Sequence, residues 1–194
     1  MHRSEIKSDI IFPTYIWSAE LDNINTQELK SLAYDLKSNS PGKLISGYGG
    51  WQSNRFKDNF PDKLKPLIEQ LENRIVEIAF QIQIPTPKFG NIWFNLNSPG
   101  SYNQIHNHMG AILSGVYYVD VPDSESGDIE FHRNDEADYY LRQILKPGHR
   151  FSSIKLIYPA KTNTLYIFPA WLKHSVQGNK SDKDRISISF NYGY

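Results

Sequence analysis

The 194-residue sequence contains no cysteine. Disulfide bonds and thiolate metal ligands are therefore excluded within this chain, and a metal ion would have to be held by histidine, carboxylate or backbone oxygen. Long apolar runs are also missing, since none approaches the roughly 20 residues that a membrane-spanning helix needs. The first residues, Met1 to Asp9, are mostly polar and do not resemble a secretion signal. We therefore expect a soluble, cytoplasmic protein that does not interact with a membrane.

Neither sign of charge is in excess, because 21 Lys and Arg balance 21 Asp and Glu. A broad electrostatic attraction to nucleic acid is not expected, although a local basic groove is compatible with this balance. The hydrophobic fraction of 39% is enough for a sizeable core, and the length fits one domain. Within residues 1–194 we expect a mixed helical and extended region at 1–90. It would pack on a β core at 91–194 that carries the functional site.

The order of predicted helices and strands indicates the fold class. Two stretches have apolar residues at helical spacing, residues 26–38 and 62–80. From residue 91 onward apolar and polar residues alternate, which is typical of β-strands. Two helices followed by such strands predict a mainly β fold with flanking helices, and we favour a distorted jelly roll with a site at its open end. The strand candidates are residues 91–97, 111–121, 128–132, 153–158, 164–168 and 185–192.

Three histidines are candidates for a metal site. His106 and His108 lie two residues apart, so on extended backbone their imidazoles point to the same side. Such a pair also arises by chance on surface loops, and imidazole suits iron, zinc, copper and nickel alike. His174 follows a proline turn, where it is either a third ligand or an ordinary packed residue. The other histidines lie in terminal, acidic or Pro-Gly contexts and are assigned no metal: His2, His132 and His149.

A candidate anion-binding residue begins the last predicted strand. Alternation places Arg185, Ser187 and Ser189 on one face of this strand and apolar residues on the other. A buried guanidinium is costly unless an anion pairs with it. Its planar donors match a carboxylate, to which a serine hydroxyl can add a further hydrogen bond. Arg185 therefore either binds an anionic ligand or pairs with one of the chain's own acids.

Several short motifs, taken jointly, carry a family resemblance over nearly the whole chain. They are Phe12-Pro13-Thr14, Gly49-Gly50-Trp51-Gln52-Ser53, His106-Asn107-His108, Leu113-Ser114-Gly115-Val116-Tyr117-Tyr118 and Arg185 through Asn191. The sequence resembles the 2-oxoglutarate/Fe(II)-dependent oxygenases, whose fold is a cupin-like double-stranded β-helix. Within that superfamily it is most similar to a group with a His-x-His motif that is found in marine bacteria and their phages.

The resemblance implies a dioxygenase that couples oxidative decarboxylation of 2-oxoglutarate to the oxidation of a second substrate. It implies Fe(II) held by His106, His108 and His174. It also implies that Arg185 and Ser187 bind the distal carboxylate of the 2-oxoglutarate cosubstrate. The substrate itself, a small molecule or a protein side chain, is not indicated by the sequence, because fold and metal site do not define the pocket.

One position departs from the wider superfamily, in which an Asp or Glu stands where this chain has His108. Three neutral imidazoles leave an Fe(II) site one positive charge higher than two imidazoles and a carboxylate do. We prefer the three histidines as ligands. The alternative is a set that includes Glu130 or, less favoured, Asp128, either of which would restore a carboxylate.

Polar residues around the histidine pair are candidates for the cosubstrate pocket. We expect Asn95, Tyr102 and Tyr117 to line it and to bond the cosubstrate, although Asn-rich turns also form for backbone reasons. The acidic stretch from Asp120 to Asp138 is either a solvated loop or a lid that prefers a cationic substrate. Three neighbouring residues share the expectation for the pocket: Asn97, Asn103 and Gln104.

Two other functions compete with the oxygenase. The first is a non-catalytic metal-binding or sugar-binding jelly roll, in which the same histidines hold zinc. The second is a purely structural module, for instance a virion or scaffold component. Binding of iron together with 2-oxoglutarate would separate the enzyme from both. We also allow for a homodimer.

Overall fold

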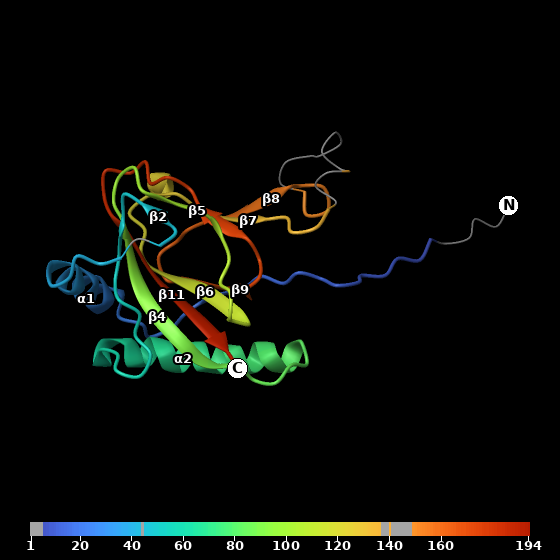
Figure 1. Ribbon diagram of the computed structural model, residues 1–194, viewed down its shortest axis with the longest axis horizontal. Coiled ribbons are helices and arrows are strands. Elements are labelled where there is room, and N and C mark those ends of the chain that lie inside the picture. Colours follow the sequence, from blue (N-terminus) through green and yellow to red (C-terminus); the bar gives the residue numbers. More distant parts are fainter. Residues whose placement is uncertain (1–5, 44, 137–139, 141–148) are drawn as a thin grey trace.

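The computed structural model describes residues 6–43, 45–136, 140 and 149–194. Among these residues, helices and strands follow one another as the sequence predicted, with the helices early and most strands late (Figure 1). In chain order the elements are β1 (Trp17–Glu20), α1 (Thr26–Ser38), β2 (Gly47–Tyr48), β3 (Trp51–Gln52), η1 (Asp62–Leu64), α2 (Lys65–Gln81), β4 (Lys88–Asn97), β5 (Tyr102–His106), β6 (Leu113–Asp120), η2 (Ser124–Ser126), β7 (Ile129–His132), β8 (Lys155–Tyr158), β9 (Thr164–Pro169), β10 (His174–Val176) and β11 (Arg185–Gly193).

The strands form two antiparallel sheets that face each other. The larger sheet has the order β1-β9-β6-β11-β4-β3, and the smaller one has the order β2-β5-β10-β7-β8. Neighbours in each sheet are mostly distant in the sequence, as in the pairing of β11 with β4 and β6. This arrangement confirms the predicted jelly roll with flanking helices.

Both helices cover the outer face of the larger sheet, where α2 runs across the strands (Figure 1). Helix α1 has the predicted bounds and buries Leu29, Leu32 and Ala33. Helix α2 begins after the short η1 turn, so that Pro66 lies in its first turn, where its missing N–H costs no hydrogen bond. The burial of each Leu or Ile side chain in this layer contributes about 1.5–3 kcal/mol. This core fixes the helices against the outer face of the larger sheet.

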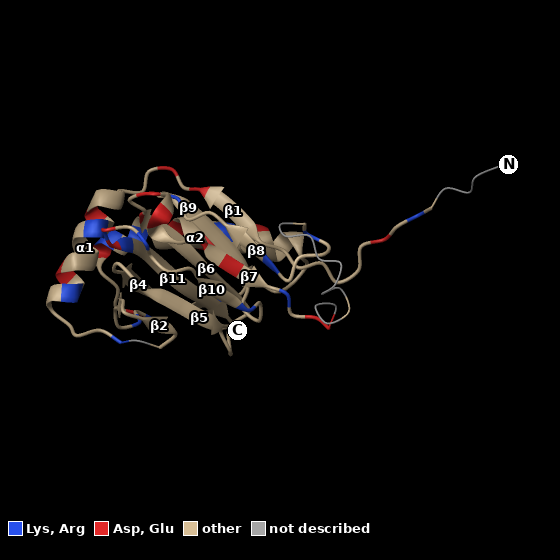
Figure 2. Ribbon diagram, turned by 90° about the horizontal axis from the view of Figure 1, so that it is seen from above, with Lys and Arg blue, Asp and Glu red and all other residues tan. Residues whose placement is uncertain are grey.

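The space between the sheets is divided into an apolar part and a polar part. Side chains from β6, β7 and β9, among them Tyr118, Phe131 and Phe168, fill the apolar part. The polar part is open to solvent and lies against β11, β4 and β5. Charged residues gather on α1 and in the loops, whereas the central strands carry few of them (Figure 2). A charged side chain between the sheets is therefore an exception that needs a partner or a function.

All six predicted strands are present, with bounds that differ by a few residues. Three early strands, β1 to β3, were not predicted as strands, because two to four residues are too few to show an alternation. The acidic stretch includes the η2 turn, which Asp123 caps, and an ion pair of Asp120 with Lys30 at 2.7 Å. Asp138 lies outside the described residues. No helix in the described part of the chain is both long and apolar enough to cross a membrane.

Gly115 marks the tightest point of the packing between β6 and its neighbours. A Cβ atom at this position would meet the ring of Phe190 and would lie 2.6 Å from the carbonyl oxygen of Tyr166. We expect Gly115→Ala to lower the free energy of unfolding by about 1–3 kcal/mol, because overpacking forces backbone shifts. Gly178→Ala is the matched control, since nothing lies within 4 Å of the added carbon. Equal urea midpoints for the two variants would contradict this expectation.

Candidate metal centre

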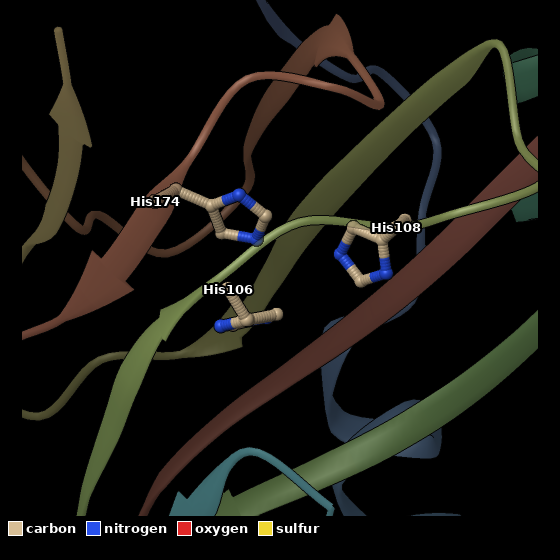
Figure 3. A group of neighbouring side chains, drawn as sticks. All are labelled: His106, His108 and His174. Carbon is tan, nitrogen blue, oxygen red and sulfur yellow. The ribbon is translucent and has the colours of Figure 1, made fainter. Parts of the chain in front are cut away.

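His106, His108 and His174 lie together between the sheets, and their ligand atoms are all within 4.8 Å of one another. Figure 3 shows the three rings converging on one point from two strands and the loop that follows β5. The ring centroids of His106 and His174 are 4.3 Å apart, and those of His108 and His174 are 5.1 Å apart. The structure thus brings together all three histidines that the sequence predicted, across 68 positions of the chain.

Strand pairing explains how these histidines meet. The last residue of β5, His106, is the direct partner of the first residue of β10, His174. The backbone N–H of His108 donates to the carbonyl oxygen of Ala170 at 2.9 Å, which ties the loop after β5 to the turn before β10. The turn that follows Pro169 therefore helps to position His174 relative to the other two histidines.

The backbone also orients two of the rings. Nδ1 of His106 donates to the carbonyl oxygen of Gln104 at 2.7 Å, and Nδ1 of His174 donates to that of Leu172 at 2.9 Å. A carbonyl oxygen only accepts, so each Nδ1 carries the proton and each Nε2 keeps its lone pair. This is the tautomer in which histidine binds a metal through Nε2, with the outer hydrogen bond holding the ring in place.

Burial keeps the three imidazoles neutral. It lowers the pKa of His106, although the hydrogen bond to Gln104 opposes the shift. Burial, together with the charges of His106 and Arg55, lowers the pKa of His108 to about 4. Burial and the other histidines lower the pKa of His174 to about 3. At neutral pH all three groups are in the unprotonated form that a metal ion requires.

Glu130 does not join this group, and the structure does not support it as a ligand. It faces away from His174, because it pairs with Ser175, the next residue of β10. Its carboxylate accepts from Lys155 at 2.6 Å, from Gln177 at 2.9 Å and from Ser175 at 3.0 Å. Burial raises the pKa of Glu130, but these hydrogen bonds outweigh burial and the net pKa is lowered.

The weaker alternative, Asp128, is also engaged elsewhere. Its Oδ1 accepts from the backbone N–H of Ala160 at 2.8 Å. Neither Asp128 nor Glu130 is among the described residues that line the cavity beside the histidines. The alternative ligand set with a carboxylate is therefore not supported.

The physical reason is that the side of the sheet to which a residue points depends on the register of its strand with the neighbouring strand. Alternation within one strand does not reveal this register.

A cavity of about 300 Å³ lies beside the histidines, and Arg185 is one of its walls. The guanidinium is 1% exposed, and its Nη1 donates to the carbonyl oxygens of Ser126 and Gly127 at 3.0 and 2.6 Å. Its Nε has no hydrogen-bond partner within the described residues, and no carboxylate there forms an ion pair with it. Burial lowers the pKa of Arg185, yet an arginine remains protonated at neutral pH. Within the described residues the cavity therefore contains a buried guanidinium that forms no ion pair with a carboxylate, although the charge of Asp128 acts on it.

Some of the predicted pocket residues lie in this cavity. Ser187 and Asn95 are direct partners on β11 and β4 and both line it. Asn95 donates to Ser189 at 3.0 Å and accepts from the indole N–H of Trp93 at 3.1 Å, so its amide is fixed. The further polar residues that were expected there also line the cavity: Asn97, Asn103 and Gln104.

Tyr102 and Tyr117 are corrections, because neither lines the cavity. Tyr102 is 37% exposed and packs against Tyr48 on the outside of the smaller sheet. Tyr117 is buried in the helix-covered core, where its hydroxyl donates to Asn163 at 2.8 Å. The neighbour of Tyr117 on β6, Tyr118, faces the cavity instead, directly opposite Ser187.

Tyr118 and Gln52 are cavity residues that the sequence did not single out for this role. Tyr118 is 1% exposed, and burial raises the pKa of its hydroxyl, against the effect of Arg185. Gln52 pairs with Asn95 from strand β3. The motif around Trp51 marked the region of Gln52, but only the register of β3 with β4 shows that the side chain faces the site.

Comparison with known proteins fits this geometry. Residues 91–191, more than half of the chain, match the family described as “Putative 2OG-Fe(II) oxygenase”. The chain belongs to this family. It is accordingly a dioxygenase of the class that uses Fe(II) and 2-oxoglutarate. Curated protein sequences gave no match.

Solved structures show that this oxygenase shares its fold with distant proteins. A prolyl-4-hydroxylase from Pseudomonas putida is similar with a TM-score of 0.69 and 10% identity over 92% of both chains. A viral collagen prolyl hydroxylase from Paramecium Bursaria Chlorella virus-1 has a TM-score of 0.60 and 15% identity, over 93% of this chain and 97% of that chain. The epimerase SnoN, solved with Fe3+, alpha ketoglutarate and nogalamycin RO, has a TM-score of 0.67 and 14% identity, over 92% and 78%.

The side chains of the oxygenase fit both cofactors. Three imidazoles with free lone pairs are suitable ligands for Fe(II) and leave coordination positions open. The unpartnered Nε of Arg185 is a buried donor of the kind that a carboxylate satisfies. The fit thus rests on the donor set and on an orphaned polar atom.

The pKa values of the histidines predict how the metal-free oxygenase responds to acid. Because the pKa values of His108 and His174 in the folded state lie below the ordinary value of 6.5, the unfolded chain takes up protons first as the pH falls. We expect stability to be constant above about pH 7 and to fall progressively from about pH 6.5 to about pH 4. Melting temperatures of the metal-free protein test this. His174→Gln should flatten the profile.

The hydrogen bonds of Glu130 predict a second effect. Glu130→Ala leaves Lys155, Ser175 and Gln177 without an acceptor, so we expect a loss of about 1–3 kcal/mol in the free energy of unfolding. Glu77→Ala, which breaks the exposed pair with Arg74, is the control and should cost under about 1 kcal/mol. Similar urea denaturation midpoints for both variants would show that the network around Glu130 contributes little.

Proposed function

We propose that the protein is an Fe(II)- and 2-oxoglutarate-dependent hydroxylase whose iron is held by His106, His108 and His174. The observation that carries this assignment is the cavity that joins these histidines to the buried guanidinium of Arg185. Three neutral imidazoles supply the metal ligands, and the arginine supplies a partner for a dicarboxylate. The substrate is a small molecule or a protein side chain.

In this proposal Arg185 and Ser187 bind the distal carboxylate of 2-oxoglutarate. The guanidinium is fixed in advance by the carbonyl oxygens of Ser126 and Gly127, so little side-chain entropy is lost on binding. Tyr118, opposite Ser187, is the further hydrogen-bonding group at this end of the cavity. We add it to the cosubstrate site in place of Tyr117.

Asn95 has a supporting role in the same proposal. Its bonds to Trp93 and Ser189 hold the polar wall of the cavity between the arginine and the histidines. The bound iron would supply oxidation of the substrate coupled to decarboxylation of 2-oxoglutarate. The chain itself would orient the cosubstrate between Arg185 and the histidines, which line one cavity.

The zinc-binding jelly roll predicts a different result in a direct test. Anaerobic titration of the protein with Fe(II) and then 2-oxoglutarate should give a visible metal-to-ligand charge-transfer band in the oxygenase. A protein that retains metal but gives no band would support the non-catalytic alternative.

The same titration tests the residues. We expect Arg185→Ala to weaken 2-oxoglutarate binding on the order of 30-fold or more, since hydrogen bonds to a charged group contribute about 1.5–3 kcal/mol each. Iron binding should persist in this variant and be lost in His174→Ala. Arg185→Lys keeps the charge without the fork of donors and should lie in between.

Arg74→Ala, at an exposed arginine on α2, is the matched control and should titrate like the wild type. A band of normal affinity in Arg185→Ala would exclude the arginine as the carboxylate partner. An intact band in His174→Ala would exclude the proposed ligand set.

A further inference from the structure

Arg55 is a second positive charge at the cavity, at the end where His108 lies. It follows strand β3, is exposed, and lines the cavity together with Arg185. Its guanidinium carbon is 5.0 Å from the ring centroid of Trp93, whose ring is in turn 5.8 Å from that of His108. Arg55, Trp93 and His108 therefore form a row that leads from solvent to the metal site.

The indole ring holds this arginine in place without neutralising it. Trp93 is 4% exposed, and its N–H is bonded to Asn95, so the ring is a fixed platform. A guanidinium over an aromatic ring is attracted to the ring and keeps its positive charge. Within the described residues no carboxylate forms an ion pair with Arg55.

The surroundings of Arg55 contain no opposing charge. None of the described residues that line the cavity is an acid. A neighbouring hollow of about 360 Å³ shares Arg55 with the cavity and adds Lys88, again with no Asp or Glu side chain among its described residues. The described residues that line the open side of the site thus include Arg55 and Lys88 and no Asp or Glu.

The charge of the loaded site leads to the same result. Iron(II) brings two positive charges, and Arg185 and Arg55 bring one each, whereas 2-oxoglutarate brings two negative charges. The three histidines add none, because histidine binds a metal ion in its neutral form. Two positive charges remain, one more than in a site where a carboxylate stands at His108. A substrate with a negative group would balance them, and a cationic substrate would be repelled.

Among the acids of the acidic stretch, Asp128 does not line the cavity but its charge acts on Arg185, whereas the three acids named next have partners elsewhere. Asp120 pairs with Lys30, and Asp123 caps the η2 turn and accepts from Ser181. Glu130 is bonded on the far side of β7. The alternative of a lid for a cationic substrate thus finds no carboxylate facing the cavity among the described residues.

We propose that Arg55 binds an oxyanion group of the substrate, a phosphate or a carboxylate, and so selects anionic substrates for oxidation at this site. The inference rests on the proposed function, which supplies the metal and the cosubstrate. Arg55 fixes the anionic end of the substrate one aromatic ring away from His108. The remainder of the substrate then lies toward the iron.

Small probe ions test this without knowledge of the substrate. The protein is loaded with Co(II) in place of iron and with 2-oxoglutarate, and inorganic phosphate is followed by phosphorus NMR. We expect the paramagnetic metal to broaden the phosphorus line saturably in the wild type. In Arg55→Gln the apparent affinity should fall tenfold or more, and Arg55→Lys should retain part of it. Arg74→Gln is the matched control and should behave like the wild type.

Two further probes set the class of the ligand. Acetate, followed by its methyl protons, tests a carboxylate in place of phosphate. Broadening of either anion that is stronger in the wild type than in Arg55→Gln supports the proposal. Methylammonium, a cation of similar size, should show no broadening that depends on Arg55. Equal broadening of phosphate in the wild type and Arg55→Gln, or stronger binding of methylammonium than of either anion, would overturn the inference.

The same samples separate this inference from the proposed function. The proton lines of 2-oxoglutarate report whether the cosubstrate binds next to the metal. In one outcome the 2-oxoglutarate lines broaden while the Arg55→Gln substitution leaves anion binding unchanged. This outcome would support the cosubstrate site and contradict the proposed anion site. Unbroadened 2-oxoglutarate lines in the metal-loaded wild type mean that the proposed function itself fails.

Discussion

The site depends on one short strand pairing, in which β10 lies between β5 and β7. This pairing sets His174 opposite His106 and at the same time sets Ser175 opposite Glu130. The strand has three residues, so its own ladder contributes few hydrogen bonds. Its position is strengthened from both sides: inward by the packing of His174 against Phe168, and outward by the bond of Ser175 to Glu130.

The two faces of β10 differ in whether their charged groups have partners. On the outer face, the carboxylate of Glu130 is balanced by Lys155 and by neutral donors. On the inner face, neutral imidazoles and two guanidiniums surround a cavity without a carboxylate in its described wall. Grouping polar groups without partners in this way lowers the free energy of unfolding. A metal ion and an anion that bind only the folded state would raise it again. The stability of the fold and the filling of the site are therefore coupled.

The sequence was sufficient for those features that depend on one strand or one helix at a time. Alternation placed Arg185 and Ser187 on one face of β11, and the His-x-His spacing placed two imidazoles on one side. Helical periodicity gave the buried face of α1. These patterns repeat every two or every 3.6 residues, and each is complete within a few residues.

The features that failed depend on register between strands. Tyr117 and Tyr118 are adjacent, and the choice between them follows from the register of β6 with β11, which sets Tyr118 opposite Ser187 and Tyr117 opposite Ile188. Strands of two residues, such as the one that presents Gln52, are too short to show a pattern. Pairing between strands that are far apart in the sequence leaves no local signature, so these assignments needed the folded structure.

Register also explains why, within the described residues, no carboxylate accompanies the histidines. To bring Glu130 to the inner face, β7 would have to slip by one residue against β10, and such a slip would turn every side chain of β7 over. Phe131, which packs against Phe168 and His174, would then leave the core. Burial of a phenylalanine contributes about 1.5–3 kcal/mol, and Lys155 and Gln177 would lose their acceptor as well. The packing of the smaller sheet therefore places the three histidines, and not Glu130, on the inner face, as the proposed ligand set requires.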